Sequence, residues 1–152
     1  VRIEAPDVFK IIGAFKQNNL GFFHRLMSEQ EIKSSSVEQV FMGLLACYIE
    51  NDAHVPVSCD GALLRKKLYE LEEEDFALWA ISLMSKEEII TGGHINSMSF
   101  RKISDLLQRA GFASVTEVKT GMSNSTQMLK ELKGIERAHR GYYSVIVEAT
   151  KI

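Results

Sequence analysis

His94 is the residue of this 152-residue sequence whose type and position best suit acid–base chemistry. It follows two glycines and precedes a predicted helix. Its ordinary pKa near neutrality suits a general base or a donor that orients a substrate. The same side chain can equally hydrogen-bond to the backbone and shape the turn. The spacing of the other histidines suits no metal ion, so the sequence predicts no zinc site; they are His24, His54 and His139.

A basic run ending at two tyrosines is a second candidate for binding. Arg140, together with Arg137 and His139, can hold an acidic group of a substrate, or it can belong to an ordinary polar loop. Tyr142 and Tyr143 can form one wall of a substrate site, or they can pack at the start of a strand. Both interpretations stay open for each group.

Asp7 lies between the first predicted strand and the first predicted helix. It can cap that helix or contact a substrate. Nucleophilic catalysis has no support, because no serine lies in a GxSxG pattern and neither cysteine has a partner base. Cys47 and Cys59 also lack CxxC spacing, which favours a reduced intracellular protein over a disulfide framework. The catalytic residues, if any, stay unknown at this stage.

Length and composition predict one domain over residues 1–152 with an ordinary core, because 45% of the residues are hydrophobic. Eighteen basic and twenty acidic residues leave a net charge of −2. That balance gives no signal for nucleic acid or for an anionic membrane. No apolar run approaches the roughly 18 residues that span a bilayer, and no signal peptide is visible. We therefore expect a cytoplasmic protein with no membrane association.

The two ends of the chain nearly repeat each other. Val1–Ala5 and Val145–Ala149 both read as short β-branched strands with an acid at the same place. The first of them begins without a start methionine or a preceding loop. We therefore expect the chain to be cut from a larger protein.

Between these ends, apolar periodicity and capping residues predict about six helices and one further strand. The clearest helix covers Val37–Ile49, with Ser35 and Glu38 fitting a capping box. A loop is expected over Asn51–Cys59. The other predicted helices begin near Asp7, at Leu20, after Asp60, before Phe76 and near Ser97 or Ser99, and the strand covers Ser114–Lys119.

Three segments, in this order, resemble the C-terminal part of class I S-adenosylmethionine-dependent methyltransferases. Val-Arg-Ile-Glu-Ala-Pro-Asp, residues 1–7, is similar to the fifth strand of that family and the start of the next helix. Gly93-His94 and then residues 99–112, ending in Ala-Gly-Phe, resemble the helix and turn before the sixth strand. Residues 144–151, Ser-Val-Ile-Val-Glu-Ala-Thr-Lys, resemble the closing seventh strand.

The resemblance implies an α/β fold, namely a truncated Rossmann-like methyltransferase. It implies one three-stranded mixed sheet in the order 5-7-6, with the last strand antiparallel in the middle. Residues 21–91 match nothing in the family and are expected to be a helical insertion.

The family binds its cofactor through the first half of its fold, which this chain does not contain. Gly92-Gly93 is the only glycine pair, and it neither belongs to a GxG pattern nor follows a clear strand. S-adenosylmethionine is therefore expected as the cofactor of a full-length protein, and no cofactor is expected for this chain alone.

The implied topology gathers distant residues at one edge of the sheet, because open α/β sheets bind ligands at the carboxyl ends of their parallel strands. Strand five delivers Pro6 and Asp7, and the segment after strand six delivers Gly121–Ser123. The candidate substrate-binding residues are Asp7, His94, Asn96, Ser123, Arg140, Tyr142 and Tyr143.

Three functions stay open. The first is the substrate-side portion of a methyltransferase, inactive alone, whose methyl acceptor is an unknown small molecule or macromolecule. The second is a non-enzymatic α/β module that forms a homodimer through the exposed edge of the opening strand or through the helix Val37–Ile49. The third is a small-ligand binding protein that uses the edge described above.

Overall fold

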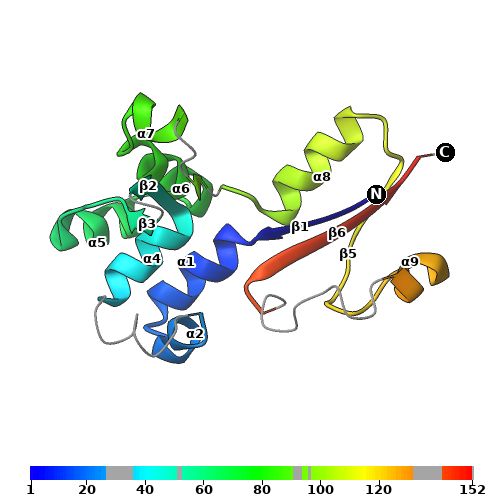
Figure 1. The fold of residues 1–152 in the computed structure, drawn as a ribbon, viewed down its shortest axis with the longest axis horizontal. Coiled ribbons are helices and arrows are strands. Elements are labelled where there is room, and N and C mark those ends of the chain that lie inside the picture. Colours follow the sequence, from blue (N-terminus) through cyan, green and yellow to red (C-terminus); the bar gives the residue numbers. More distant parts are fainter. Residues whose placement is uncertain (27–35, 51–52, 91–93, 96, 132–141, 152) are drawn as a thin grey trace. The chain divides into compact units, whose positions relative to one another are not determined.

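The computed structural model describes residues 1–26, 36–50, 53–90, 94–95, 97–131 and 142–151. Within these residues the fold is α/β, with eight helices and two three-stranded antiparallel sheets (Figure 1). The chain divides into two compact units. We call Val1–Asp7 with Met98–Ile152 the sheet unit, and Val8–Ser97 the helical unit, and describe each by itself.

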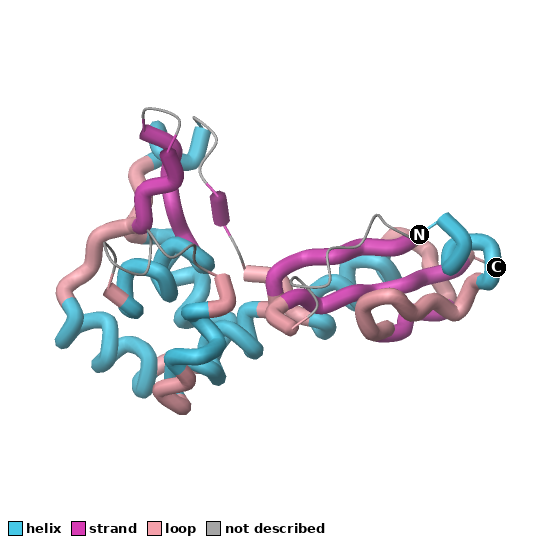
Figure 2. The backbone as a smooth tube through the Cα atoms, turned by 60° about the horizontal axis from the view of Figure 1, so that its bottom comes forward, coloured by secondary structure: helices cyan, strands magenta, loops and turns pink. Residues whose placement is uncertain are grey.

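The sheet unit is built on the two ends of the chain. Its elements are β1 (Arg2–Pro6), α8 (Phe100–Arg109), β5 (Ser114–Glu117), α9 (Thr126–Glu131) and β6 (Ser144–Thr150). The strand order is β1-β6-β5, and Figure 2 shows the long, closely paired strands of this unit. The predicted order and the central place of the last strand are confirmed.

The pairing of this sheet corrects one part of the prediction. β6 runs antiparallel to both neighbours, with Ile3 opposite Val147 and Val115 opposite Ala149. Every neighbouring pair is thus antiparallel, and the expected mixed sheet is wrong in that respect. The expectation of a single sheet is wrong too, because the helical unit contains a second one.

Alternation along the strands gives the first sheet two different faces. One face packs on α8, where Val145, Val147 and Ala149 meet Ile103 and Leu107 in a buried cluster (Figure 1). The next residues along each strand lie on the opposite face, which carries polar and charged side chains. This second face is where the site described below is built.

Both ends of α8 are fixed by local signals that the sequence contains. The Ser99 hydroxyl accepts a hydrogen bond from the Lys102 N–H at 3.2 Å, which caps the first turn. At the other end Gly111 has a positive φ of 84°. Its N–H donates to Gln108, and the Phe112 N–H donates to the Leu107 carbonyl, which is the Schellman arrangement. The predicted cap and left-handed turn are confirmed.

The helical unit contains α1 (Val8–Lys16), α2 (Leu20–His24), α4 (Val37–Leu45), α5 (Gly61–Glu70), α6 (Glu73–Ser82) and α7 (Lys86–Ile90). Four phenylalanines hold α1, α2, α4 and α6 together. Phe15 and Phe41 stack with ring centroids 4.0 Å apart, and Phe41 lies 5.8 Å from Phe76. Phe23 meets Phe15 and Phe41 edge-on. We call these four residues the phenylalanine cluster.

The second sheet corrects the prediction of one helix over Val37–Ile49. Helix α4 ends at Leu45, and β2 (Ala46–Glu50) follows without a gap. β2 pairs with β3 (Ala53–Pro56) and with β4 (His94–Ile95). Cys47, expected in the helix, is therefore in a strand. The apolar residues of 46–49 fit a helix or a strand, and pairing with β3 and β4 decides for the strand.

Two further expectations in this region are corrected. The predicted loop Asn51–Cys59 contains β3, and its residues 51–52 lie outside the described part. The capping box of α4 uses Ser36 and Gln39 instead of Ser35 and Glu38. The Gln39 N–H donates to the Ser36 hydroxyl, and the Gln39 side chain accepts from the Ser36 N–H at 2.8 Å. A glutamine at the third position does this as well as a glutamate.

The described residues thus contain six strands and eight helices, against the three strands and about six helices predicted. The expected helical insertion over residues 21–91 is only partly helical, because it contains β2 and β3. The compact unit also begins earlier, at Val8, since Ile11, Ile12 and Phe15 of α1 pack into its core.

Candidate functional site

The predicted sheet edge brings together three of the seven candidate residues. The Asp7 N–H donates to the Tyr143 carbonyl at 2.8 Å and extends the ladder between β1 and β6. Tyr142 and Tyr143 form an edge-to-face pair with centroids 5.5 Å apart. Asp7 is buried, and both tyrosines are half-buried. The backbone of this edge therefore places Asp7 next to Tyr143.

Of the other four candidates, Ser123 alone is described within the sheet unit. Asn96 and Arg140 lie outside the described residues. His94 is in β4 of the helical unit, where its backbone pairs with Cys47. Ser123 lies in the segment after β5, which turns back across the polar face of the sheet.

The position of Ser123 follows from the contacts of its neighbour. The Asn124 N–H donates to Glu148 Oε2 at 2.8 Å, and the Asn124 side chain donates to the Thr116 hydroxyl at 2.8 Å. Glu148 is four residues along β6 from Ser144, the residue opposite Pro6. Four strand residues span about 13 Å. Ser123 therefore lies far from the Asp7 edge.

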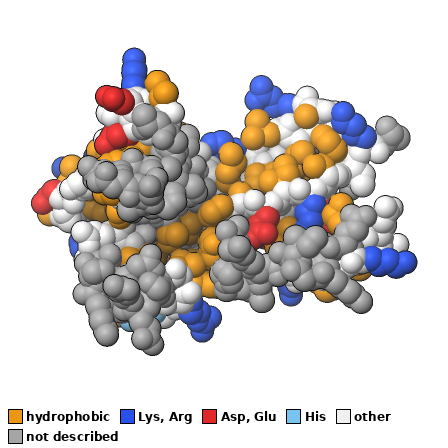
Figure 3. Space-filling model, in the orientation of Figure 1, with side chains coloured by type: hydrophobic (Ala, Val, Ile, Leu, Met, Phe, Trp, Pro, Cys, Tyr) orange, Lys and Arg blue, Asp and Glu red, His pale blue; other side chains and the backbone are white. Residues whose placement is uncertain are grey.

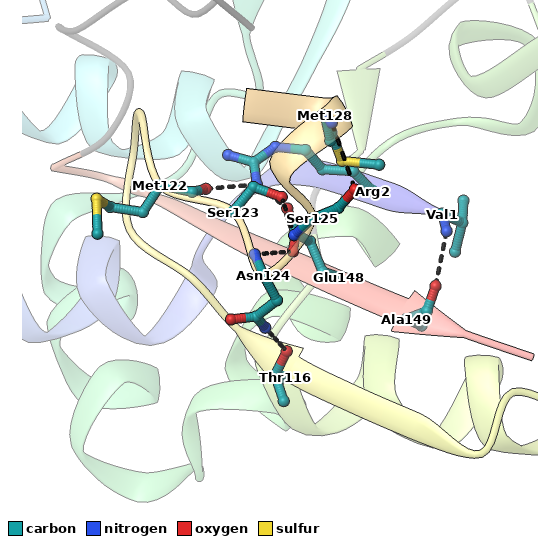
Figure 4. Close-up of polar contacts among 10 residues, drawn as sticks. All are labelled: Val1, Arg2, Thr116, Met122, Ser123, Asn124, Ser125, Met128, Glu148 and Ala149. Carbon is teal, nitrogen blue, oxygen red and sulfur yellow. Dashed lines mark hydrogen bonds and ion pairs between the residues drawn. The ribbon is translucent and has the colours of Figure 1, made fainter. Parts of the chain in front are cut away.

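An ion pair between Arg2 and Glu148 forms the centre of the polar face (Figure 4). Arg2 Nη1 lies 2.6 Å from Glu148 Oε1 and also donates to the Met122 carbonyl at 2.9 Å. The two side chains are only 10% and 8% exposed. We call Arg2, Thr116, Ser123, Asn124 and Glu148 the Arg2–Glu148 cluster.

This cluster holds Glu148 in its charged form. Burial disfavours the carboxylate, but hydrogen bonds from the Ser123 hydroxyl, the Asn124 N–H and Arg2 outweigh it and lower the pKa of Glu148. A carboxylate that is charged and whose two oxygens are both bonded is poorly suited to proton transfer near neutral pH. The hydrogen bonds and the ion pair of this cluster instead connect the segment 122–125 to β1 and β6.

A pocket beside the cluster is too small for a cofactor. Its volume is about 200 Å³, and its lining includes Thr116, Asn124, Met128 and Glu148. Ligand sites for molecules of drug size usually have roughly 300–1,000 Å³. We therefore assign this cluster a positioning role in the fold.

The sequence contained one signal for this cluster, the acid at the same place in both end strands. The antiparallel register decides its meaning, because it sets Glu148 opposite Arg2 and Glu4 opposite Ile146. Glu4 accepts a hydrogen bond from the Ser144 hydroxyl instead. Residues 146 positions apart cannot be paired without knowing that register.

Other chemical groups in the described residues offer little reactivity. No group of three or more His, Cys, Asp and Glu side chains there could hold a metal ion. Cys47 is buried, and burial together with the nearby Asp60 charge raises the pKa of the Cys59 thiol. In the same part of the chain, no helix has the length and apolar character to cross a membrane.

Comparisons with known proteins assign no family. No family model matches the sequence, and neither curated proteins nor solved structures include a match.

Proposed function

We propose that this chain is the C-terminal, substrate-side portion of an S-adenosylmethionine-dependent methyltransferase of Rossmann-like fold. The observation that supports this most is the strand order β1-β6-β5, in which the last strand of the chain lies antiparallel between the other two. This is the arrangement that the sequence resemblance implies for strands five, seven and six.

The local connections agree with the same proposal. β1 leads within two residues into α1, and α8 leads through the Gly111 turn into β5. A strand–helix–strand order with these caps is common in α/β proteins, so it supports the proposal less strongly than the central antiparallel strand does. Asp7, Tyr142 and Tyr143 are then the residues that contact the methyl acceptor.

The described residues do not fit the cofactor itself. Gly121, which follows β5, has a positive φ. The next residue, Met122, accepts a hydrogen bond from Arg2 at its carbonyl, and this bond fixes the segment to β1. The adjoining pocket of about 200 Å³ has little room for a nucleoside. We therefore place cofactor binding in residues outside this chain and derive no reaction step through it.

The reading frame upstream of Val1 tests this proposal. We expect it to encode a strand followed by a glycine-rich turn and then an acid that ends the next strand. A start codon immediately before Val1, or an upstream sequence with no such turn, would contradict the proposal.

The outer edge of β1 in the described sheet favours a second candidate, a module that forms a homodimer. In the described sheet β1 has only β6 as a neighbour. Val1 bonds to Ala149 of β6, and Asp7 bonds to Tyr143 just before β6. The backbone groups of the alternate residues Arg2, Glu4 and Pro6 therefore point away from β6. Such an edge can pair with a second chain.

The register of this edge fits a copy of the same strand. An antiparallel pairing that sets Arg2 opposite Glu4 of the second copy is self-complementary and sets Ile3 against its own counterpart. An apolar pocket of about 190 Å³ lies at β1 and α8 and is lined by Ile3, Ala5, Met98, Ile103, Leu106 and Leu107. Leu106 is 49% exposed, and hydrophobic side chains gather beside α8 in Figure 3.

Glu4→Pro tests the homodimer, because it removes an N–H that points away from β6 and leaves the bonds to β6 in place. We expect sedimentation equilibrium to give a dimer for the wild type and for Glu4→Ala, and a monomer for Glu4→Pro. A wild-type monomer at high concentration contradicts this candidate. In the methyltransferase proposal the same edge is covered by a strand from outside this chain, so the two proposals compete for it.

A further inference from the structure

A pocket in the helical unit is lined by none of the residues of the Asp7 edge or of the Arg2–Glu148 cluster. Its volume is about 620 Å³, which is within the range of sites for small molecules. It is bounded by the first half of α4, by β2 and β3, and by the start of α5, the elements labelled in Figure 1. Four elements of one compact unit thus build it.

The apolar part of the lining is large enough to bind a ring. It consists of Met42, Tyr48, Val55, Pro56, Val57 and Leu64. Met42, Val57 and Leu64 are buried, and the other three are half-buried. Apolar ligand surface that enters such a pocket is removed from water, which favours binding.

The polar part of the lining contains one charged residue, and that charge already has a partner. Glu38 lies 2.7 Å from Arg65 of α5, so its carboxylate is balanced. No lysine or arginine is among the described residues that line the pocket. An anionic ligand would therefore lose its hydration without gaining an ion pair, and a cationic one would compete with Arg65.

Uncharged hydrogen-bonding groups complete the lining. They include the Gln39 amide, the Tyr48 phenol and the Ser58 hydroxyl. Amides and hydroxyls can both donate and accept, so they suit a neutral polar group such as a hydroxyl on an apolar ring. We propose that this pocket is a binding site for neutral, largely apolar small molecules that carry a hydroxyl or a similar uncharged polar group. This proposal is independent of the methyltransferase assignment.

Cys59 provides a reporter within the pocket, since its half-buried thiol is part of the lining. Alkylation of Cys59 by iodoacetamide is followed by peptide mass spectrometry, which separates it from the buried Cys47. We use 2-naphthol as the probe, with 2-naphthoate and 2-naphthylmethylammonium as charged molecules on the same ring. At a 2-naphthol concentration about ten times Kd, alkylation should slow roughly tenfold.

Gly61 offers a matched pair of variants. It lines the pocket at the first position of α5, and a Cβ there would have no atom within 4 Å. Gly61→Trp should fill the pocket and abolish protection by 2-naphthol, whereas Gly61→Ala should retain it. Ser58→Trp, at an exposed lining position, serves as a second filling variant if Gly61→Trp does not fold.

Three results would overturn the proposal. One is an alkylation rate of Cys59 that 2-naphthol leaves unchanged up to its solubility limit. Another is equal protection by 2-naphthol in a folded tryptophan variant, which would place binding elsewhere. The third is protection by 2-naphthoate or by 2-naphthylmethylammonium as strong as that by 2-naphthol, which would remove the inference that the ligand is neutral.

Discussion

The two units of this protein are stabilised in different ways. The core of the helical unit is apolar and aromatic, and its phenylalanine cluster connects four helices. The sheet unit buries a smaller apolar cluster on one face and an ion pair on the other. Stability in the first unit should depend on shape and volume. In the second it should depend also on charge, and therefore on pH.

The largest expected effect is in the phenylalanine cluster. Phe41 is fully buried and contacts the other three rings. Phe41→Ala should lower the free energy of unfolding by about 4 kcal/mol, because it leaves a cavity among rings that cannot close over it. Urea unfolding monitored by circular dichroism measures this. Phe9→Ala, at a 40% exposed position of α1, is the control and should cost far less.

The ion pair of the sheet unit should give the next largest effect. Glu148→Gln keeps the size of the side chain but leaves Arg2 without its buried partner charge. We expect a loss of about 3 kcal/mol in the free energy of unfolding. Hydrogen exchange should show the loss of protection first at the amides of β6. Glu4→Gln, on the same face but exposed, should change little, and an equal loss there would contradict the account.

Acid should act on the sheet unit in the same way as Glu148→Gln. The pKa of Glu148 is lowered in the folded protein, so its contribution is complete above the unfolded pKa of roughly 4.3 and is lost as the pH falls through the folded pKa. Unfolding between pH 7 and pH 3 should therefore show a smaller pH dependence in Glu148→Gln than in the wild type. An identical pH dependence would mean that Glu148 does not carry this effect.

The smallest of these effects is expected at the C-terminal turn of α8. Gly111→Ala places a Cβ on a backbone with φ of 84°, which costs about 1 kcal/mol although there is space for the atom. Thermal unfolding should show a small decrease in Tm. An increase would indicate that the turn adjusts without strain.

The same contrast explains which features could be predicted from the sequence. The caps and turn of α8 depend on Ser99, Gly111 and Phe112, which lie within a few residues of the groups they bond. The order of the three strands in the sheet unit followed from a resemblance carried by the two ends of the chain. Local chemistry and strand pattern were sufficient for both.

Apart from the capping box of α4, the features that were missed depend on strand partners outside the segment itself. Residues 46–50 became β2 because β3 and β4 pair with them, and His94 lies more than forty positions away in the chain from Cys47. The bonds from Arg2 to Glu148 and to Met122 likewise need the register of β1 against β6. Among the candidate residues, strand order alone is sufficient to bring Asp7 next to Tyr143, and their role as a site stays a prediction.

The central claim is that this chain is the substrate-side portion of a methyltransferase. Paired calorimetric titrations with S-adenosylmethionine test it most directly, one on this chain and one on the protein encoded by the complete reading frame. We predict binding to the complete protein and none to residues 1–152 alone. Tight binding to residues 1–152, or no binding to the complete protein, would contradict the account.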